Sequence, residues 1–449
     1  MALLVDEQTG AFAGLMTDGD VRRALLAGMG LESSVEHVER KSPIVAKAGT
    51  PLHEIAGMFS EKLRFVPLLD DKGEVVDLAV LDRRMRLPVA EPMLGERELE
   101  YVTECILTGW ISSAGRFVTR LEEQFAAFCQ TRFGVATSSG TTALHLALLA
   151  LNIGPGDEVI VPSLSFIATA NAVAYTGAKP VFVDIEADSW NLDPGALEAA
   201  ITPLTKALLP VHLYGHPANM DPILEIARRH NLYVVEDAAE SPGARYKGRP
   251  VGGLSDIAIF SFYGNKIVTT GEGGMVVTNN EEVAERVRLL RDHGMSKVRR
   301  YWHPVLGYNY RMTNLQAAVG VAQMEKVERI LETKARLAAT YDSLFKDIPG
   351  ITCPPQAEWA SPVCWLYTLL VDERIFGESR DTFIRTLQQH NVESRPAFPP
   401  IHKQPLYEAG ITLPVAERVS NQGVSLPSAV SLTHADIERI VSVIRAMRD

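Results

Sequence analysis

A single lysine, Lys266, stands among apolar and small neutral residues in the segment SFYGNK, residues 261–266, just after a predicted strand. A lysine shielded from water binds its proton less tightly, and its amine becomes a nucleophile able to form a Schiff base. The alternative is a solvent-exposed lysine in a hairpin, which is the usual location of this residue type.

An acidic pair ends another apolar run, in the segment VVEDAAE at residues 234–240. A carboxylate at a strand end, such as Asp237, can pair with the nitrogen of a pyridine ring and keep it protonated. Protonation makes the ring a better electron sink. The alternative is an acidic loop that pairs with a lysine or arginine on the surface.

An anion-binding turn is predicted in the segment SSGTTA, residues 138–143, between a strand and a helix. Gly140 allows a tight turn, and the free N–H groups of a first helical turn attract anions, aided by the helix dipole. The hydroxyls of Ser139, Thr141 and Thr142 add hydrogen-bond donors. The alternative is an ordinary N-cap formed by serine or threonine.

A fourth polar segment, GYNYRMTN at residues 307–314, precedes a helix predicted to begin near Leu315, for which Asn314 is a suitable N-cap. In chain order, the turn, the carboxylate and the lysine are the three parts that a pyridoxal phosphate site needs. They would bind the phosphate, pair with the ring nitrogen and attach the cofactor. Together they favour the catalytic interpretation over the separate alternatives.

These residues need a scaffold, and the chain between residues 132 and 278 alternates predicted strands and helices. Short strands that are apolar on both faces and alternate with helices are typical of a largely parallel sheet covered on two sides. The predicted strands are 132–139, 158–163, 180–185, 207–214, 232–236, 257–262 and 275–278. Ligands of such sheets bind at the carboxyl ends of strands, where the candidate residues fall.

Composition limits the class of protein. The chain has 449 residues, of which 46% are hydrophobic and 22% charged, and its formal net charge is −11. This is the composition of a globular protein with more than one domain, and the acidic charge disfavours nucleic acid as a partner. We find no apolar run long enough for a membrane span, no secretory signal and no C-x-x-C pattern. A cytoplasmic small-molecule enzyme without a metal site is expected.

Three parts are expected along the chain. A basic, proline-punctuated stretch at residues 81–88 marks a linker after a small α+β unit, residues 1–85. A large domain, 86–324, and a smaller C-terminal α/β subdomain, 325–449, follow. The first part resembles a partial pair of CBS domains, since GLMTDGD at residues 14–20 matches that family's ribose-contacting pattern. The second module lacks the threonine, so nucleotide binding or a packing role both stay open.

From residue 87 the chain resembles the DegT/StrS group of sugar aminotransferases, which are fold-type I pyridoxal phosphate enzymes with a mainly parallel sheet. The matching segments are GWISS at 109–113, SGTTAL at 139–144, PSLSF at 162–166, EDAAE at 236–240, SF at 261–262 with Lys266, GEGG at 271–274 and NYRM at 309–312. Within the group it is most similar to the GDP-perosamine synthases, through VHLYGHP at 211–217, Glu240, YWH at 301–303 and GYNYRMTN at 307–314.

The resemblance implies a role for each matching residue. Lys266 would hold pyridoxal phosphate and shuttle the proton, and Asp237 would pair with the ring nitrogen. The remaining cofactor-binding residues would be Gly140, Thr141, Thr142, Phe166, Glu240, Ser261 and Asn309. Asn309 would reach the phosphate from a partner subunit, so a homodimer is the smallest active unit and a higher oligomer stays open. Glu240 would lie near the phenolic oxygen, where charge repulsion favours a shared proton.

The implied reaction is a transamination in two halves. L-Glutamate gives up its amine and leaves as 2-oxoglutarate, and the amine passes to C4 of GDP-4-keto-6-deoxy-D-mannose to form GDP-perosamine for O-antigen lipopolysaccharide. Relatives with histidine in place of the lysine are 3-dehydratases, so Lys266 argues against that branch. The candidate substrate contacts are Trp110, Ser112, Arg300, Trp302, His303, Tyr308, Arg311, Arg395 and His402.

Other interpretations stay open. The same motifs would serve a UDP- or dTDP-linked 4-ketosugar, as in bacillosamine or pseudaminic acid routes. A non-catalytic regulator that senses nucleotide through residues 1–85 is disfavoured by the complete pair of lysine and aspartate. The basic run Lys297, Arg299 and Arg300 has a plainer reading as a solvated helix end, and His145 is expected to be a packed helix residue.

Overall fold

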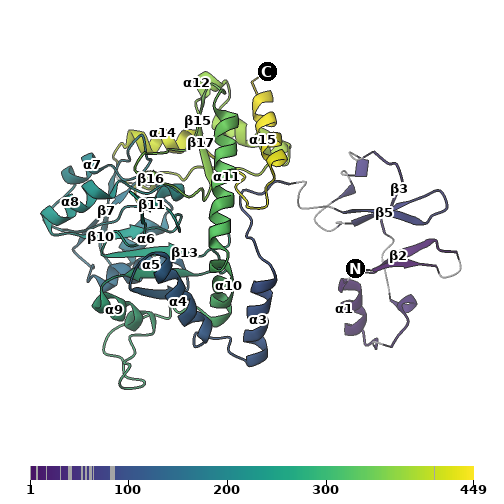
Figure 1. Cartoon of the computed structure of the whole chain (residues 1–449), viewed down its shortest axis with the longest axis horizontal. Coiled ribbons are helices and arrows are strands. Elements are labelled where there is room, and N and C mark those ends of the chain that lie inside the picture. The colour runs from purple at the N-terminus through teal and green to yellow at the C-terminus, as the bar shows by residue number, and fades with distance from the viewer. Residues whose placement is uncertain are drawn as a thin grey trace. The chain divides into compact units, whose positions relative to one another are not determined.

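The computed structural model describes residues 2–448 apart from 7–8, 17, 31, 39–42, 52–53, 56–57, 60–62, 64, 81–85 and 409. The chain forms two compact units, Met1–Arg86 and Leu87–Asp449 (Figure 1). Thr17 of the CBS-like pattern and the linker residues 81–85 lie outside the described residues.

The described residues of the first unit form two small sheets. The strands β1 (Ala2–Val5) and β2 (Phe12–Met16) pair antiparallel, and helix α1 (Asp18–Leu26) follows them. Strand β4 (Phe65–Leu69) lies between β3 (Ala46–Lys47), which is parallel to it, and β5 (Val75–Val80), which is antiparallel. These elements form the expected α+β unit, but this arrangement does not by itself identify a pair of CBS domains.

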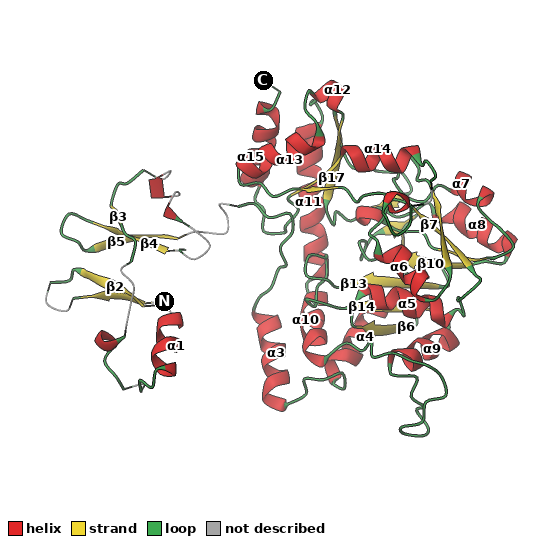
Figure 2. Ribbon diagram, turned by 180° about the vertical axis from the view of Figure 1, so that it is seen from behind, coloured by secondary structure: helices red, strands yellow, loops and turns green. Residues whose placement is uncertain are grey.

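The second unit is built on a seven-stranded sheet with the order β6-β14-β13-β10-β9-β7-β8 (Figure 2). Its strands are β6 (Phe133–Thr137), β7 (Glu158–Pro162), β8 (Lys179–Val183), β9 (Thr205–Leu208), β10 (Tyr233–Asp237), β13 (Ile257–Ser261) and β14 (Gly274–Thr278). Neighbours are parallel except at β14, which is antiparallel to both β13 and β6. The largely parallel sheet predicted from the sequence is confirmed, and β14 makes it mixed.

Helices cover this sheet on two sides. The helices of this part of the chain are α3 (Glu96–Thr108), α4 (Arg116–Phe128), α5 (Gly140–Ala150), α6 (Ala168–Tyr175), α7 (Pro194–Ala199), α8 (Met220–His230), α9 (Glu281–Arg291) and α10 (Asn314–Met324). Every position of β7, β13 and β14 is buried. Because successive side chains of a strand point to opposite faces, both faces must be covered.

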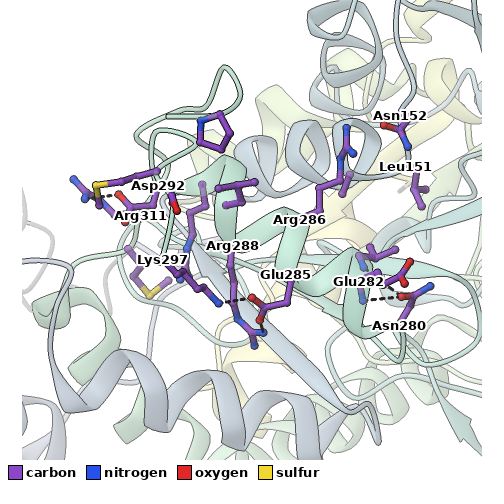
Figure 3. Close-up of a pocket in the computed structure, with 18 of the residues that line it drawn as sticks. Leu151, Asn152, Asn280, Glu282, Glu285, Arg286, Arg288, Asp292, Lys297 and Arg311 are labelled. Atoms are coloured by element: carbon purple, nitrogen blue, oxygen red, sulfur yellow. Dashed lines mark hydrogen bonds and ion pairs between the residues drawn. The ribbon is translucent and has the colours of Figure 1, made fainter. Parts of the chain in front are cut away.

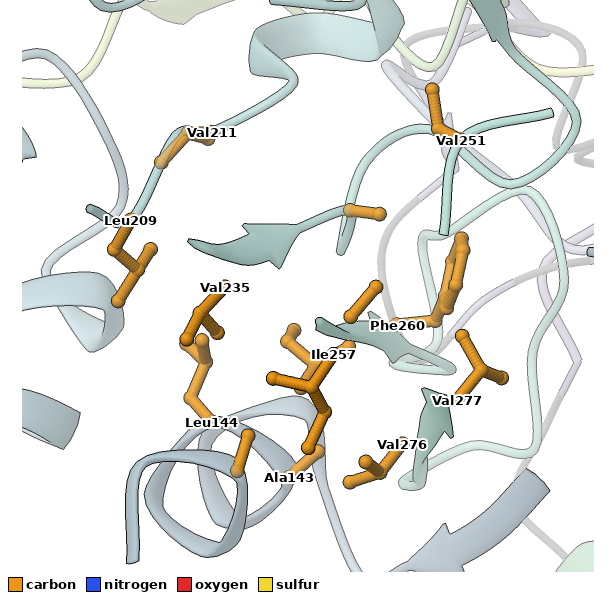
Figure 4. Close-up of a cluster of buried hydrophobic side chains, with 14 of the residues drawn as sticks. Ala143, Leu144, Leu209, Val211, Val235, Val251, Ile257, Phe260, Val276 and Val277 are labelled. Carbon is orange, nitrogen blue, oxygen red and sulfur yellow. The ribbon is translucent and has the colours of Figure 1, made fainter. Parts of the chain in front are cut away.

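Aliphatic side chains fill the space between α5 and the sheet (Figure 4). Ala143 and Leu144 of α5 belong to the same buried cluster as Val235 of β10 and Ile257 of β13. The helix is buried along most of its length, so the packing fixes its N-terminus. A Cβ atom at Gly140 would lie 2.8 Å from the Cβ of Ser261, which places this N-terminus against the end of β13.

The strand predicted at 207–214 is shorter than expected. Strand β9 ends at Leu208, and Leu213–Gly215 forms a 3-10 turn in which Tyr214 has a φ of 52°. Pro210 follows the strand closely and has no N–H to donate to a sheet. A Cβ atom at Gly215 would lie only 1.7 Å from the carbonyl oxygen of Val363, so this turn requires glycine.

The C-terminal subdomain has its own antiparallel sheet, ordered β15-β17-β19-β18. Its elements are α11 (Val327–Phe345), β15 (Ile351–Thr352), β17 (Tyr367–Val371), α12 (Glu373–Phe376), α13 (Arg380–Gln389), β18 (Arg395–Pro396), α14 (Pro414–Gln422), β19 (Gly423–Leu426) and α15 (His434–Ala446). A small sheet joins β11 (Arg245–Tyr246), β12 (Arg249–Pro250) and β16 (Ala360–Ser361). Leu87 packs into the core of this subdomain, although the sequence boundary assigned it to the large domain.

Within the described part of the chain, no helix combines the length and the apolar character needed to cross a lipid bilayer.

Candidate active site

Asp237 is the last residue of β10 and is buried. Its Oδ2 accepts a hydrogen bond from Thr169 Oγ1 at 2.8 Å, and its Oδ1 accepts one from the N–H of Ala239 at 3.2 Å. Burial raises the pKa of this carboxyl, while the two hydrogen bonds and the nearby Lys266 favour its ionised form. The side chain is therefore held rigidly at a strand end, as the partner of a protonated ring nitrogen must be.

Lys266 lies in the loop between β13 and β14, and its side chain is only 11% exposed, which excludes the exposed-hairpin alternative. Its Nζ lies 3.5 Å from Glu240 Oε1. Burial lowers the pKa of the amine, whereas the carboxylates of Glu240 and Asp237 oppose this change. Lys266 contacts Glu240, which follows Asp237 by three residues, so the lysine and both carboxyl groups belong to one buried site.

Glu240 completes this group of titratable side chains. Its Oε2 accepts a hydrogen bond from the N–H of Tyr214 at 2.7 Å, and its Oε1 faces Lys266. Burial raises the pKa of Glu240, which the Lys266 amine and the Tyr214 N–H oppose. A carboxyl with a raised pKa takes up a proton readily, so Glu240 is placed to exchange one with Lys266.

The turn between β6 and α5 is both a helix cap and an anion-binding corner. Ser139 Oγ accepts a hydrogen bond from the Thr142 N–H at 3.2 Å, so the N-cap considered from the sequence is present. The close approach of Gly140 to Ser261 also brings the first turn of α5 next to the Ser261 hydroxyl. Backbone N–H groups at a helix N-terminus beside a hydroxyl suit a phosphate group.

Phe166 follows β7 and remains 55% exposed, with its ring centroid 5.8 Å from that of Phe398. An aromatic ring that stays exposed near the carboxyl end of a strand is available to stack on a planar ligand. With the anion-binding corner, Asp237 and Lys266, the donor set therefore fits pyridoxal phosphate.

Asn314 does not cap its helix. The N-cap of α10 is Thr313, and Asn314 is a buried residue within the helix. Its backbone N–H donates to the carbonyl of Ser112 at 2.6 Å, and its side-chain amide donates to the carbonyl of Trp110 at 2.7 Å. These bonds fix the loop between α3 and α4, while the Trp110 side chain stays 59% exposed.

Several predicted contacts lie on the exposed loop that follows α9: Arg300, Trp302, His303, Tyr308, Asn309 and Arg311. Arg311 pairs with Asp292 at 2.7 Å and donates to Asn309 Oδ1 at 3.2 Å. Tyr308 stacks on Tyr310, and both rings contact His145, which is buried in α5 as expected. The ring of His303 bonds to the carbonyl of His293 at 2.9 Å.

The basic run within this loop does not lie at a helix end. The guanidinium of Arg299 lies over the ring of Trp302 at 4.2 Å, and that of Arg300 lies over Tyr301 at 5.0 Å. Lys297 instead pairs with Glu285 on α9.

A large hollow of about 1340 Å³ runs along α9 (Figure 3). Its lining includes the pair of Asp292 and Arg311 and the contact of Lys297 with Glu285. The residues that line it include none of the buried titratable groups at Lys266. The reactive site is therefore marked by buried charged groups and not by the size of a cavity.

Arg395 and His402 come from the C-terminal subdomain. Arg395 is exposed and pairs with Glu393 at 3.3 Å. His402 is buried, with its Nδ1 2.5 Å from Ser163 Oγ and its Nε2 3.1 Å from Glu417 Oε1. Both ring nitrogens of His402 thus have partners within the chain, and a substrate would have to displace one of them.

Three residues at the site were not predicted from the sequence: Thr169, Tyr214 and Trp365. Thr169 bonds to a carboxylate 68 residues away, and Trp365 bonds to the backbone of Asn265 across 100 residues, so no local pattern reveals them. Tyr214 lies in the segment VHLYGHP. Gly215, the residue after it, could have indicated an unusual turn from the sequence.

Comparison with known proteins identifies the family. Residues 92–445 match the model of the DegT/DnrJ/EryC1/StrS aminotransferase family. The chain belongs to this family. It is 50% identical over 362 residues to a GDP-perosamine synthase of Caulobacter vibrioides, which covers 80% of this chain and 97% of that protein. It is 42% identical over 352 residues to one from Escherichia coli O157:H7, with 78% and 95% covered.

Solved structures of this kind share the fold. DesV of S. venezuelae is 40% identical with a TM-score of 0.74, and covers 78% of this chain and 94% of its own. The PLP form of the sugar aminotransferase Spr1654 from Streptococcus pneumoniae is 27% identical with a TM-score of 0.76, and covers 81% and 98%. This chain is therefore an enzyme, an aminotransferase of the α/β aminotransferase fold that depends on pyridoxal phosphate.

Proposed function

We propose that this aminotransferase converts GDP-4-keto-6-deoxy-D-mannose to GDP-perosamine, with L-glutamate as the amino donor. The identity of 50% to a GDP-perosamine synthase, over 97% of that protein, carries the proposal. The buried group of Lys266, Glu240 and Asp237 supports it. The reaction replaces the C4 ketone oxygen of the sugar by an amine, and glutamate leaves as 2-oxoglutarate, so no further oxidant is needed.

Pyridoxal phosphate, when bound, supplies an electron-withdrawing ring that carries the amine between the two substrates. The carboxylate of Asp237, held by Thr169 and Ala239, keeps the proton on the ring nitrogen. The Nζ of Lys266 removes a proton from the α-carbon of glutamate and later delivers one to C4 of the sugar. Glu240, 3.5 Å from this Nζ, takes up and returns the proton that the lysine exchanges.

We further propose that the active unit is a homodimer. Asn309 would reach the cofactor phosphate bound by a partner subunit, beside the N-terminus of α5 and Ser261. The basic and aromatic residues of the same loop would lie near the nucleotide diphosphate. Val298 and Leu306 on this loop are 98% and 82% exposed. A partner subunit would cover these apolar side chains.

We also propose that residues 1–85 form a CBS-like unit that packs or binds a nucleotide. Isothermal titration calorimetry of the full-length protein with AMP and ATP tests nucleotide binding. Absence of heat at millimolar nucleotide would leave only the packing role.

A panel of GDP-, UDP- and dTDP-linked 4-keto-6-deoxy sugars, each with L-glutamate, tests the substrate. We expect turnover of the GDP-linked sugar by the wild type and none by Lys266→Ala. DesI, which is 32% identical to this chain, has a solved structure in the presence of its TDP-sugar product, and this favours the dTDP-linked sugar as the second candidate. Turnover of only the UDP- or dTDP-linked sugar would refute the assignment of the GDP-linked substrate.

A further inference from the structure

The indole ring of Trp365 lies directly beside the amine of Lys266. The Nζ atom is 3.5 Å from the centroid of the ring and also 3.5 Å from Glu240 Oε1. An ammonium group over the face of an indole is attracted by the negative face of the ring, most strongly where water is excluded. Trp365 is 4% exposed, so the contact is nearly dry.

Two further hydrogen bonds fix this tryptophan relative to the lysine. The indole Nε1–H donates to the carbonyl of Asn265, the residue before Lys266, at 2.8 Å. The carbonyl of Trp365 accepts a hydrogen bond at 2.8 Å from Nζ of Lys334, a buried lysine on α11 that also donates to the carbonyl of Ser428. Trp365 therefore contacts both the backbone of Asn265 and the side chain of Lys266.

We propose that Trp365 is a positioning residue that holds the free ammonium group of Lys266 beside Glu240 whenever the lysine is not bonded to the cofactor. The inference rests on the proposed function, in which Lys266 is set free during each half of the reaction. A released lysine side chain is long and flexible, and burial opposes its charge. The indole face and the Glu240 carboxylate together offset that cost, so the released lysine stays beside Glu240, with which it exchanges its proton.

The charged groups around the ammonium come from several elements. Asp237 ends β10 and Glu240 follows it, and both carboxyl groups favour the charged form of the Lys266 amine. Lys334 and Glu91 line, together with Lys266, a small cavity of about 10 Å³. The contribution of the indole can therefore be isolated only by changing Trp365 while these groups stay in place.

The test uses full-length protein loaded with pyridoxamine phosphate, in which Lys266 carries no covalent bond. Competitive acylation with acetic anhydride across a pH series, read by peptide mass spectrometry, gives the titration midpoint of Lys266. We expect Trp365→Leu to lower this midpoint by about 0.5 to 1.5 pH units, the size of one cation–π contact. Trp365→Phe, which keeps an aromatic face, should lower it less.

The exposed Lys247 serves as an internal standard, because its midpoint should be the same in every variant. Trp359→Leu is the matched control, since Trp359 packs against His216 and Tyr246. A midpoint of Lys266 in Trp365→Leu that equals or exceeds the wild-type value would overturn the proposal. The labelling needs no sugar substrate, so failure of the GDP-linked sugar in the panel would leave this result standing.

A second measurement covers the case in which Trp365→Leu does not fold. Tryptophan emission of the wild type should change with the protonation of Lys266. This change should disappear in Lys266→Met and in Trp365→Phe. A titration that persists in Trp365→Phe would show that the indole at 365 does not sense the lysine, and would contradict the proposal.

Discussion

The two units of this chain differ in how much apolar surface they bury. In Met1–Arg86 the described buried core consists of Ala46, Ile55 and Val66, while the side chain of Leu26 is 80% exposed. In Leu87–Asp449, two extensive clusters of buried hydrophobic side chains surround the main sheet and the C-terminal subdomain. Burial of apolar surface is the main driving force of folding, so the second unit has by far the stronger scaffold.

This difference supports the proposed location of the chemistry in the second unit. Asp237, Glu240 and Lys266 are shielded from water, and only a dense core can hold such groups with perturbed pKa values in fixed positions. The family match also begins at residue 92, after the first unit. We therefore expect transamination to be complete within the second unit, and four experiments can break or sharpen this comparison.

The largest effect is expected for Lys266→Ala in the second unit. Without the amine no side chain can attach the cofactor or move the proton, so glutamate-dependent amination should fall by roughly 10⁴-fold. The measurement is formation of the 4-amino sugar, followed by mass spectrometry. Lys247→Ala, an exposed lysine paired with Asp221, should retain full activity. Activity of Lys266→Ala within tenfold of the wild type would contradict the assignment.

A smaller loss is expected for Asp237→Asn. The amide oxygen can still accept the hydrogen bond from the Ala239 N–H and the amide NH2 can donate to the Thr169 hydroxyl, but the side chain lacks the charge that keeps the ring nitrogen protonated. We expect kcat to fall by about 10² to 10³, as for loss of one preorganised electrostatic contact, without a change in the unfolding midpoint. Asp221→Asn provides an exposed control. Unchanged kcat in Asp237→Asn would remove the carboxylate from the mechanism.

A charged group buried in the dense core should make the stability of the protein depend on pH. Burial lowers the pKa of Lys334 from 10.5 to about 8, so between these values the unfolded chain binds more protons than the folded one. The unfolding free energy of the wild type should therefore rise with pH across this window, by up to about 1.4 kcal/mol per pH unit.

Lys334→Met should lack this rise. Below pH 8 the difference in unfolding free energy between the two proteins should be constant. Urea unfolding at several pH values measures it. Parallel pH profiles for the two proteins would show that Lys334 is not perturbed.

The smallest effect is expected for deletion of residues 1–85. Because these residues bury little and the groups at Lys266 come from the second unit, kcat/KM should stay within about twofold of that of the full-length enzyme. A truncated protein that keeps the cooperative unfolding of the second unit but loses activity would show that the first unit takes part in catalysis.

Much of the scaffold, and the positions of the candidate residues near strand ends, were predictable from local patterns. Apolar runs that alternate with helices predicted the sheet, and the punctuation after each run placed Gly140, Asp237 and Lys266 near strand ends. The strand expected at 207–214 ends at Leu208, because Pro210 has no N–H to donate to a ladder and the chain turns at Tyr214. Asn314 was a reasonable N-cap by composition, yet Thr313 occupies that position.

The sequence by itself determined the residue types for the reaction and the order in which the chain supplies them, because strand and helix periods depend on neighbouring residues. Only the tertiary structure decided which distant side chains support them: Thr169 against Asp237, Tyr214 against Glu240, and Trp365 against Lys266. These contacts join segments that lie far apart along the chain. No local pattern encodes them, because the first two follow from the packing of the large domain and the third from the packing of the C-terminal subdomain against it.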